Sequence, residues 1–413
     1  MTKNDDKRVP ALRFKGFNDD WAQRKLKDLT DVRDGTHSSP KYVEAGHPFI
    51  TSKNINNGSI DYRDIKYITD EDFDEINKRS KVDIHDILMG MIGTVGNLAL
   101  IDKKPNFAIK NIALIKDIGK IDYLFLYNFL QSNYVSKELI QKLDGGTQKF
   151  ISLNKVRDLN ISVASFQEQK AISKCLMRVN NLLILQQRKA QQLKLLKKAM
   201  MQDLFNDRDI PKLRFSGFKD NWSNVNLGEI GKATGGTPLE SEFIKNGSYK
   251  VISIGSYTEN HKYNNQGMRV NLNRKTKKRI MNKDDLAMIL NDKTKSGKII
   301  GSVLLISDND SFVYNQRTER IEPNHDKFSS QFLFQYLNAN TIRNKIVSNA
   351  QGNTQIYVNW SSISKINYLI PSIDEQKRIG KLLFSLDSII DIQQGKIEKY
   401  YKVKHFLLQN MFI

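Results

Sequence analysis

The chain has 413 residues, more than one compact core usually holds, so we expect two or more domains of ordinary size. Lys and Arg number 65 against 45 Asp and Glu, a formal net charge of +20, and 39% of the residues are hydrophobic. The apolar share excludes a wholly disordered chain. The positive charge favours a polyanionic partner, with nucleic acid first and an anionic membrane surface second, although a Lys-rich proteome alone would also produce it.

Targeting signals and cysteine chemistry narrow the class further. The first ten residues contain no apolar h-region, and no run approaches the ~18 apolar residues that a membrane span needs. The single cysteine, Cys175, excludes an internal disulfide and a Cys-based zinc site. We expect a cytoplasmic protein.

A motif near the start of the chain recurs in its middle. Residues 9–22 read VPALRFKGFNDDWA, and residues 210–223 read IPKLRFSGFKDNWS at an offset of 201. The dipeptide Gly35-Thr36 is matched by Gly236-Thr237 at the same offset. The chain is therefore predicted to be a tandem duplication, and repeats of this length indicate two similar domains.

After each copy of this motif, short apolar runs punctuated by Gly, Asn, Asp and Ser predict strands, and a longer apolar segment then predicts a helix. We expect an α/β (α+β) domain with a strongly bent sheet in each half. The predicted strands are residues 48–50, 84–91, 97–101 and 109–115 in the first half and 249–254, 286–290 and 299–306 in the second. The predicted helices are residues 123–143 and 328–349.

A second pair of motifs follows at an offset of 207. Gly145 to Gln148 reads GGTQ and Gly352 to Gln355 reads GNTQ, while residues 166–170 (FQEQK) are matched by 373–377 (IDEQK). Between the motifs, residues 40–120 and 240–325 match poorly. The motifs at both ends of each half match, whereas the residues between them differ. This pattern suits two domains that have the same function but different targets.

Two long helices are predicted from about residue 166 to 204 and from 373 to the end, because apolar residues recur there with a spacing near 3.5. Each helix carries a Gln and a Lys in its seam, and 39 residues at ~1.5 Å each give a rod on the order of 58 Å. The helices either pack separately or pair with each other, and we favour an antiparallel pair. The predicted pairing residues are Ile172, Leu176, Val179, Leu183, Gln186, Leu193, Ile379, Leu383, Leu386, Ile390, Gln393 and Ile397.

Polar loops in both halves are suited to contacting DNA, since backbone N–H groups near Gly approach phosphates and Asn, Gln, Lys and Arg address base edges. Such loops are often merely solvated, and that alternative stays open for each residue. A basic run at residues 274–279 (RKTKKR) is a further candidate for phosphate contact. The predicted DNA-binding residues are Thr36, His37, Ser52, Lys53, Asn54, Lys149, Thr237, Arg274, Lys277, Lys293, Lys295 and Arg317.

Catalytic motifs are missing from the sequence. It has no phosphate-binding P-loop, and Gly90 to Gly96 lacks the dinucleotide fingerprint and indicates a tight turn. It also lacks the Asn-Pro-Pro-aromatic tetrapeptide of adenine methylation, and its six histidines show no metal-ligand spacing. Glu375 and Lys377 superficially resemble part of a nuclease site, but they lie where a helix begins, and helix capping explains them better. We predict no catalytic residue, no metal site and no cofactor in this chain.

The repeated P-x-L-R-F-x-G-F entry, the Gly-Thr dipeptide, the G-[GN]-T-Q tetrapeptide and the E-Q-K helix opening together resemble the specificity subunits of type I restriction–modification enzymes. The resemblance covers the whole chain in the family's order of recognition domain, helix, recognition domain, helix. It implies two target-recognition domains separated by a long antiparallel two-helix coiled coil. The implied boundaries are an N-terminal segment (1–14), recognition domain (15–165), spacer helix (166–205), linker (206–216), recognition domain (217–372) and spacer helix (373–413).

The resemblance also implies a function. Each recognition domain would read one half of a bipartite asymmetric DNA site, and the helices would set the spacer and dock two methyltransferase subunits. Restriction subunits would join through the methyltransferase core, the partners would use S-adenosylmethionine, ATP and Mg, and the chain would be nucleoid-associated in a bacterial cell. A rival interpretation is a coiled-coil scaffold that links two protein-binding modules. Salt-sensitive binding to duplex DNA distinguishes the two interpretations. A protein that neutralises DNA phosphates releases counterions, whereas a protein-binding scaffold does not.

Overall fold

The computed structural model describes residues 9–56, 58–293, 296–307 and 312–413 of the chain. The fold divides into two compact units. The first unit comprises Met1–Gln187 and Gly395–Ile413, and the second comprises Arg188–Gln394. The first unit therefore includes the final residues of the chain in addition to its N-terminal part.

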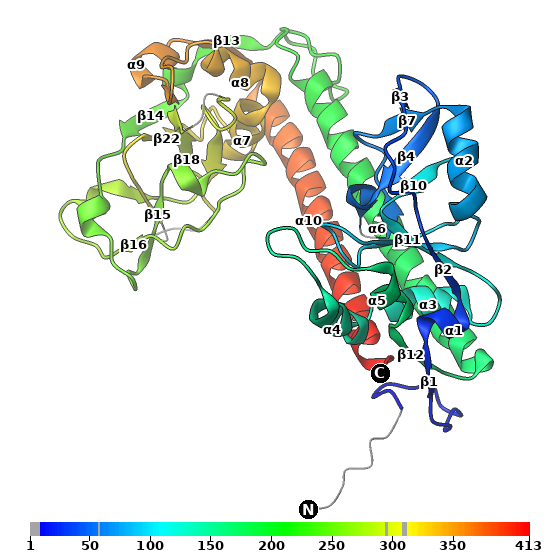
Figure 1. Cartoon of the computed structure of the whole chain (residues 1–413). Helices are drawn as coiled ribbons and strands as arrows, with labels where there is room; N and C mark the ends of the chain where they lie inside the picture. The colour runs from blue at the N-terminus through cyan, green and yellow to red at the C-terminus, as the bar shows by residue number, and fades with distance from the viewer. Residues whose placement is uncertain (1–8, 57, 294–295, 308–311) are drawn as a thin grey trace, which may run out of the picture. The chain divides into compact units, whose positions relative to one another are not determined.

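The first unit contains two four-stranded sheets among its described residues, in the orders β2-β11-β8-β9 and β10-β4-β7-β3 (Figure 1). The pairing of β10 with β4 is parallel, and the first sheet is antiparallel throughout. The strands are β1 (Ala22–Lys25), β2 (Asp31–Asp34), β3 (Tyr42–Val43), β4 (His47–Thr51), β5 (Ile55–Asn56), β6 (Ser59–Ile60), β7 (Lys66–Ile68), β8 (Ile87–Gly90), β9 (Leu98–Leu100), β10 (Ala108–Lys110), β11 (Ile112–Lys116) and β12 (Asn160–Val163). The helices are α1 (Leu26–Leu29), α2 (Asp70–Ser80), α3 (Tyr123–Leu130), α4 (Asn133–Lys142) and α5 (Leu153–Arg157).

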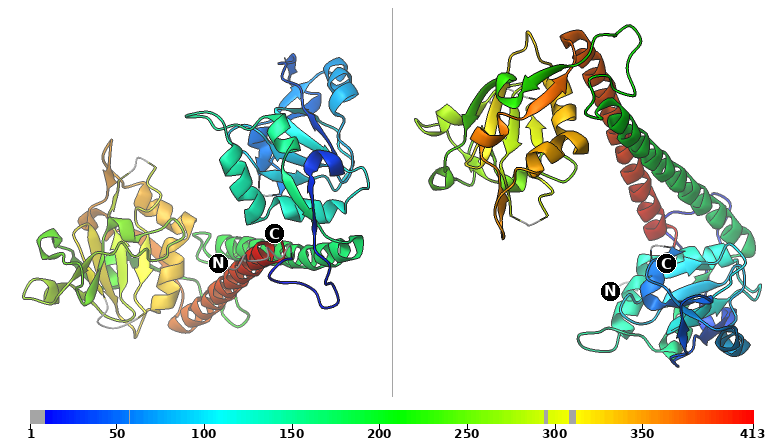
Figure 2. Two further views of the ribbon diagram at one scale, coloured as in Figure 1. Left: turned by 60° about the horizontal axis from the view of Figure 1, so that its bottom comes forward. Right: turned by 90° about the horizontal axis from the view of Figure 1, so that it is seen from above.

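The second unit repeats this arrangement, with sheets β14-β22-β18-β20 and β16-β15-β21-β17 among the described residues (Figure 2). Its strands are β13 (Ser223–Asn226), β14 (Gly231–Gly235), β15 (Tyr249–Ile252), β16 (Arg269–Val270), β17 (Ile280–Met281), β18 (Leu286–Ile289), β19 (Asn291–Asp292), β20 (Val303–Leu305), β21 (Phe312–Tyr314), β22 (Thr318–Pro323), β23 (Ile356–Tyr357) and β24 (Asn367–Ile370). Its helices are α7 (Ser330–Asn338), α8 (Asn340–Val347) and α9 (Trp360–Ile363). The two halves thus share one α/β architecture, as the internal repeat predicts.

Three elements predicted as continuous are divided in the structure. The strand predicted at 109–115 is split into β10 and β11 because Asn111 has a φ of 54°, which turns the chain between them. The helix predicted at 123–143 ends at Leu130, and the side chain of Ser132 then accepts a hydrogen bond from Val135 N to cap α4. The helix predicted at 328–349 is also divided, at Ala339, which has extended dihedrals and no side-chain cap.

Two long helices, α6 (Phe166–Leu204) and α10 (Ile373–Asn410), run out of the globular parts. In the first unit, the start of α6 and the end of α10 share one core, which contains Leu176 and Leu408. In the second unit, the end of α6 and the start of α10 share another core, which contains Leu204 and Ile379. The pairing is therefore antiparallel, as predicted. Neither these helices nor any other in the described part of the chain is long and apolar enough to cross a membrane.

Each predicted helix-pairing residue is covered to some extent. Those buried are Ile172, Leu176, Leu183, Ile379, Leu383, Gln393 and Ile397, and those half-buried are Val179, Gln186, Leu193, Leu386 and Ile390. A strict heptad predicts that one narrow stripe of each helix faces its partner, and the burial of these residues agrees with that expectation.

The two seam lysines, Lys197 and Lys404, are 207 residues apart but have different surroundings. In the second unit, Lys197 Nζ lies 2.6 and 2.7 Å from the carboxylate oxygens of Asp387. In the first unit, Lys404 Nζ donates to Gln131 Oε1 at 3.1 Å, and burial lowers the pKa of Lys404. The residue that corresponds to Asp387 is Asn180, so this copy of the seam lacks the matching carboxylate.

We expect Lys404→Met to raise the free energy of unfolding of the first unit by on the order of 1 kcal/mol, and Lys197→Met to lower that of the second. Because the pKa of Lys404 is lower in the folded than in the unfolded chain, the cost of its charge is present at neutral pH. That cost fades as pH rises through the folded pKa, so the gain from Lys404→Met should shrink in alkaline buffer. Hydrogen exchange resolved by unit at several pH values measures both effects, and equal shifts in the two variants would contradict the asymmetry.

The repeated entry motif is joined to the start of each long helix by a buried ion pair. Arg13 donates to both carboxylate oxygens of Glu168 at 2.7 and 2.8 Å, and Arg214 donates to both oxygens of Glu375 at 2.8 Å. Each Glu side chain is only 1% exposed. The Arg of the L-R-F motif and the Glu of the E-Q-K motif are therefore partners, a contact that was not predicted from the sequence.

The Gln of the E-Q-K motif also has a structural role in both copies. Gln169 Oε1 accepts from Asp122 N at 2.9 Å, and Gln376 Oε1 accepts from Ser329 N at 3.0 Å. Their amide groups donate to Ala164 O and Pro371 O respectively. Since Asp122 and Ser329 cap α3 and α7, each Gln fixes the start of a core helix against the long helix.

Candidate DNA-binding surface

The Gly-Thr dipeptide follows the first strand of the main sheet in each unit. A Cβ on Gly35 would lie 2.5 Å from Ile109 O, and one on Gly236 would lie 1.9 Å from Asn315 O. Only glycine permits this approach of two backbones, so the Gly is explained by the fold. The Thr that follows is half-buried in both units, and its backbone bridges to Lys110 in the first and Asn315 in the second.

Ser52 connects several candidate loops of the first unit, although its side chain is only 5% exposed. Its hydroxyl donates to Asn111 O at 2.6 Å and accepts from Met91 N at 3.1 Å. Asn111 N in turn donates to Thr36 O at 3.3 Å. Ser52 therefore positions the Gly-Thr loop and the loop after β8 next to each other, and its buried hydroxyl is not available to contact DNA directly.

Asn54 has a similar structural role, and Lys53 lies beside it on the surface. Asn54 is 3% exposed, accepts from Thr51 N at 3.0 Å and donates to Asp61 O at 3.2 Å. The side-chain amide of Asn54 is therefore used in hydrogen bonds within the protein. Because it is also buried, it is not placed to contact a base, contrary to the prediction from the sequence. The side chain of Lys53 is exposed.

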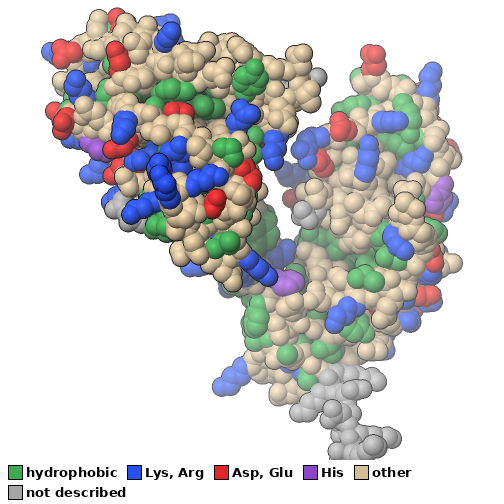
Figure 3. Space-filling model, turned by 90° about the vertical axis from the view of Figure 1, so that its left-hand side faces the viewer, with side chains coloured by type: hydrophobic (Ala, Val, Ile, Leu, Met, Phe, Trp, Pro, Cys, Tyr) green, Lys and Arg blue, Asp and Glu red, His purple; other side chains and the backbone are tan. Residues whose placement is uncertain are grey.

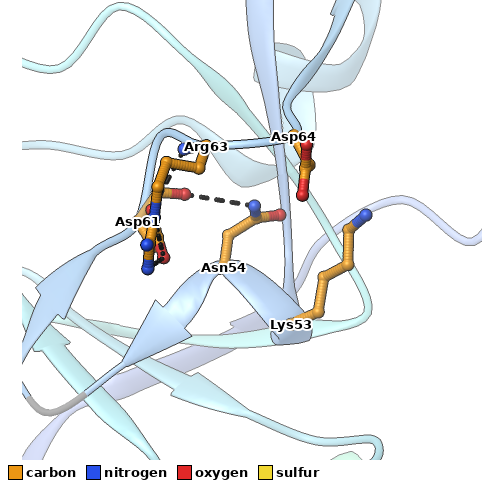
Figure 4. Close-up of a pocket in the computed structure, with 5 residues that line it drawn as sticks. All are labelled: Lys53, Asn54, Asp61, Arg63 and Asp64. Atoms are coloured by element: carbon orange, nitrogen blue, oxygen red, sulfur yellow. Dashed lines mark hydrogen bonds and ion pairs between the residues drawn. The ribbon is translucent and has the colours of Figure 1, made fainter. Parts of the chain in front are cut away.

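Lys53 and Asn54 line a pocket of about 220 Å³ together with Asp61, Arg63 and Asp64 (Figure 4). Arg63 Nη2 lies 2.5 Å from Asp61 Oδ2, and the hydrogen bonds from Arg63 lower the pKa of that carboxyl to about 2. Figure 4 shows Lys53 across the pocket from this ion pair. Because Arg63 is paired with Asp61, the exposed Lys53 is a better candidate than Arg63 for attracting a phosphate, with the carboxylate of Asp64 also lining the pocket.

His37 is exposed and held from two sides. Its Nε2 lies 2.9 Å from Asp34 Oδ2, and its Nδ1 lies 2.8 Å from Asn111 Oδ1. The buried Asp34 also pairs with Arg79 at the end of α2. An exposed ring with both nitrogens engaged has a fixed orientation, which suits a side chain that presents one face to a ligand.

In the second unit, Thr237 and Arg317 flank Asn315. The side-chain amide of Asn315 accepts from Leu239 N at 2.8 Å and donates to Glu240 Oε1 at 2.9 Å, which fixes the loop after Thr237. Arg317 is exposed, has a φ of 67°, and accepts from Leu290 N through its carbonyl at 2.9 Å. Lys293 is exposed just after β19, and Lys295 lies outside the described residues.

Arg274 and Lys277 lie on an exposed basic turn of the second unit. The side chain of Asn273 accepts from Lys275 N at 2.8 Å and from Thr276 N at 2.9 Å, and this begins the short helix η5 (Thr276–Arg279). Thr276 is buried, whereas Arg274 and Lys277 are exposed. Figure 3 shows Lys and Arg side chains gathered on the face of this unit that it presents, which suits phosphate contact.

A buried carboxylate lies on the main sheet in both units, but on different strands. In the first unit Asp34 on β2 is paired with Ala113 on β11, whereas in the second Gly235 on β14 is paired with Glu319 on β22. Glu319 is 5% exposed, and burial raises its pKa to about 7 although the charge of Arg279 opposes this. The buried acid thus lies on the strand before the Gly-Thr dipeptide in the first unit, and on the strand that pairs with the corresponding one in the second.

We expect Glu319→Gln to remove a pH dependence of stability from the second unit. Its carboxyl has a higher pKa in the folded chain than the ordinary 4.5, so the folded state binds more protons between pH 4.5 and about 7. Stability should therefore fall by about 1 to 3 kcal/mol as pH rises through that window in the natural protein and stay flatter in the variant. Thermal unfolding across pH measures this, with the exposed Glu322→Gln as control. An unchanged pH profile would contradict it.

The described residues contain no group of three or more His, Cys, Asp or Glu that could hold a metal ion. Glu375, which superficially resembles part of a nuclease site, is buried against Arg214 and so is occupied by a structural ion pair.

The comparisons with known proteins agree with this architecture. The chain matches the type I restriction modification DNA specificity domain over residues 18–195 and again over 219–400. It is 25% identical over 408 residues to a chain of Methanocaldococcus jannaschii named for the specificity subunit of the type I restriction enzyme MjaX, covering 94% of this chain and 91% of that one. It is 24% identical over 380 residues to the MjaVIII specificity subunit of the same organism, covering 88% of each.

A solved structure shows the same fold. The type I restriction–modification S subunit from M. genitalium superimposes with a TM-score of 0.61 at 18% identity, covering 98% of this chain and 99% of that one. Both halves of the chain thus belong to a class of DNA-specificity domains. The chain is a member of the family of type I restriction–modification specificity subunits, which are non-catalytic and leave catalysis to partner subunits.

Proposed function

We propose that each unit reads one half of a bipartite, asymmetric DNA site. The proposal rests on one observation: the two units share a fold, but their matching loops expose different side chains. The Gly-Thr loop leads into His37 and two serines in the first unit but into Pro238 and a buried Leu239 in the second. The short helices η1 (Ser52–Asn54) and η4 (Ile254–Ser256) also correspond, and the middle residue is Lys53 in the first but Gly255 in the second. A constant frame that presents different groups suits two different base sequences.

The helices would set the unspecified spacer and dock two methyltransferase subunits, to which restriction subunits would bind. Their surfaces outside the seam carry exposed apolar side chains, which suit burial against protein partners. These are Met177, Leu182, Ile184, Leu185, Leu195, Leu196, Ile389, Ile392, Val403 and Phe406. S-adenosylmethionine, ATP and Mg would be used by the partner subunits, and the complex would work in the cytoplasm at the nucleoid.

Sequencing of methylated adenines in cells that carry the intact operon tests the half-sites. We expect one two-part motif with a fixed gap, and exchange of residues 15–165 for the corresponding domain of another family member should alter one half only. Altered bases in both halves, or methylation without a fixed gap, would contradict the assignment of one half-site to each unit.

A separate prediction concerns the spacer. Insertion of one heptad into both α6 and α10 keeps the seam in phase and adds about 10 Å of helix, which corresponds to about three base pairs. We expect the gap in the methylated motif to grow by that amount while both half-sites stay unchanged. A seven-residue insertion in the loop before β13 is the control and should leave the gap unaltered.

A further inference from the structure

Each unit carries a short hairpin between two helices, α4 and α5 in the first and α8 and α9 in the second. Backbone bonds in both directions close the first hairpin between Asp144 and Phe150 at 2.9 and 3.0 Å. The second is closed between Gln351 and Tyr357 at 2.9 Å each way. Figure 1 shows the α4–α5 connection standing out from its unit as a finger, and Figure 2 shows the α8–α9 connection, coloured orange, doing the same. The tips hold the G-G-T-Q and G-N-T-Q tetrapeptides.

The fold explains the first glycine of each tetrapeptide. Gly145 has a φ of 87°, and a Cβ on it would lie 2.4 Å from Gln148 O. Gly352 has a φ of 102°, and a Cβ on it would lie 2.2 Å from Gln355 O. The left-handed turn and the close approach of the carbonyl both require glycine.

The fold does not explain the Thr and Gln that follow. Thr147, Gln148, Thr354 and Gln355 are all exposed, and their side chains contact no hydrogen-bond partner within the described chain. Within the same described residues, the N–H groups at the tips of both hairpins are also without acceptors. Their neighbours differ between the hairpins, since Lys149 corresponds to Ile356. Two polar residues are thus kept in both copies where the structure makes no use of them.

Each hairpin is fixed beside the candidate DNA-binding loops. In the first unit, Gly93 N donates to Lys149 O at 3.0 Å and Ile151 N donates to Met91 O at 2.9 Å. This joins the hairpin to the loop that Ser52 also holds. In the second unit, β23 pairs with β19, next to Lys293. The tips are therefore held in a defined position beside loops that carry predicted DNA-binding residues.

We propose that the two hairpin tips bind the sugar–phosphate backbone of the duplex, one at each half-site. This inference rests on the proposed function. If the units read different bases, a group that is identical in both must contact something common to both half-sites, and the backbone is common to every sequence. Hydroxyl, amide and free backbone N–H groups are the neutral donors that proteins use on phosphates. Phosphate contact at a fixed place sets the orientation of each unit so that its diverged loops meet the base edges.

The test uses the reconstituted complex and a labelled duplex that carries the site mapped by methylation sequencing. Thr147→Ala/Gln148→Ala and Thr354→Ala/Gln355→Ala should each raise the Kd about tenfold, because each removes hydrogen bonds to a charged group. Both variants should keep the melting temperature and the half-site sequences of the natural protein. A methylphosphonate scan should find a phosphate whose neutralisation weakens the natural complex but adds nothing to the defect of the variant. The exposed Gln141→Ala on α4 is the control and should leave the Kd unchanged.

Three results would overturn the proposal. Altered base preference in one half-site would make the hairpin a base reader, and loss of a methyltransferase subunit from the complex would make it a protein-docking element. An unchanged Kd in both variants would mean that the tips do not touch DNA. Failure of the natural complex to bind the mapped duplex is a different outcome, since it would overturn the proposed function itself.

Discussion

Replacing Arg13 by Met lowers the free energy of unfolding of the first unit by an expected 3 to 5 kcal/mol, roughly the cost of leaving one buried charge unpaired. Arg13 donates to both oxygens of Glu168, whose side chain is 1% exposed. Without the guanidinium, the carboxylate keeps a weaker donor, Trp21 Nε1 at 3.2 Å. The loss should therefore be close to the full cost of an uncompensated buried carboxylate. Hydrogen exchange resolved by unit measures it, because two units need not unfold together.

Two further variants identify the cause. Arg13→Met/Glu168→Met removes both charges and should recover most of the loss, since apolar residues often replace a buried ion pair without penalty. Arg24→Met changes an exposed Arg nearby and should have little effect. If the double variant were as unstable as the single one, packing rather than charge would account for the effect.

This ion pair illustrates what a single sequence leaves undetermined. The Arg of one repeated motif and the Glu of another are 155 residues apart, and neither motif alone indicates a partner. The signal was present, however, because an Arg and a Glu recur together in both copies. Repeated residues of opposite charge in an internal duplication predict a contact, and this reasoning would have found both pairs. Helix capping, the role predicted for Glu375 from its place at the start of a helix, accounts for only part of what this residue does.

The long helices were the most predictable part of the fold. Their predicted starts at 166 and 373 coincide with Phe166 and Ile373, because an uninterrupted heptad needs no distant information. The globular parts were predicted as α/β, but their boundaries depend on local caps and turns. Ser132 divides one predicted helix, and the positive φ of Asn111 divides one predicted strand. Such breaks are set by one or two residues and leave no periodic signal.

The sequence was sufficient to predict which loops form the candidate site, but not which role each side chain has in them. Lys53, His37 and Arg317 are exposed, whereas Ser52 and Asn54 are buried and hold the loops in place. From sequence, all five are polar residues in polar loops. Burial separates a residue that presents a group to a ligand from one that positions its neighbour, and burial depends on strands far away in the chain.

Phe412, near the end of the chain, is expected to contribute as much to the first unit as a residue at the centre of a recognition domain. It is 5% exposed and packs edge-on against Phe125 and Phe129, with ring centroids 5.5 Å from each. Phe205 has the corresponding place in the second unit, against Phe332 and Tyr336. Each core is thus completed by a phenylalanine just beyond the end of a long helix, and that helix begins outside the unit.

Phe412→Ala should lower the free energy of unfolding of the first unit by about 3 to 5 kcal/mol, because the aromatic cluster cannot close over the cavity. Phe406→Ala, in the last turns of α10, is a matched control, since Phe406 is 54% exposed and its loss leaves no cavity. Hydrogen exchange should show the loss of protection in β1, β12 and α3 for the first variant and near-natural protection for the second. Equal effects of the two variants would mean that helix pairing, rather than the aromatic cluster, accounts for the stability of this unit.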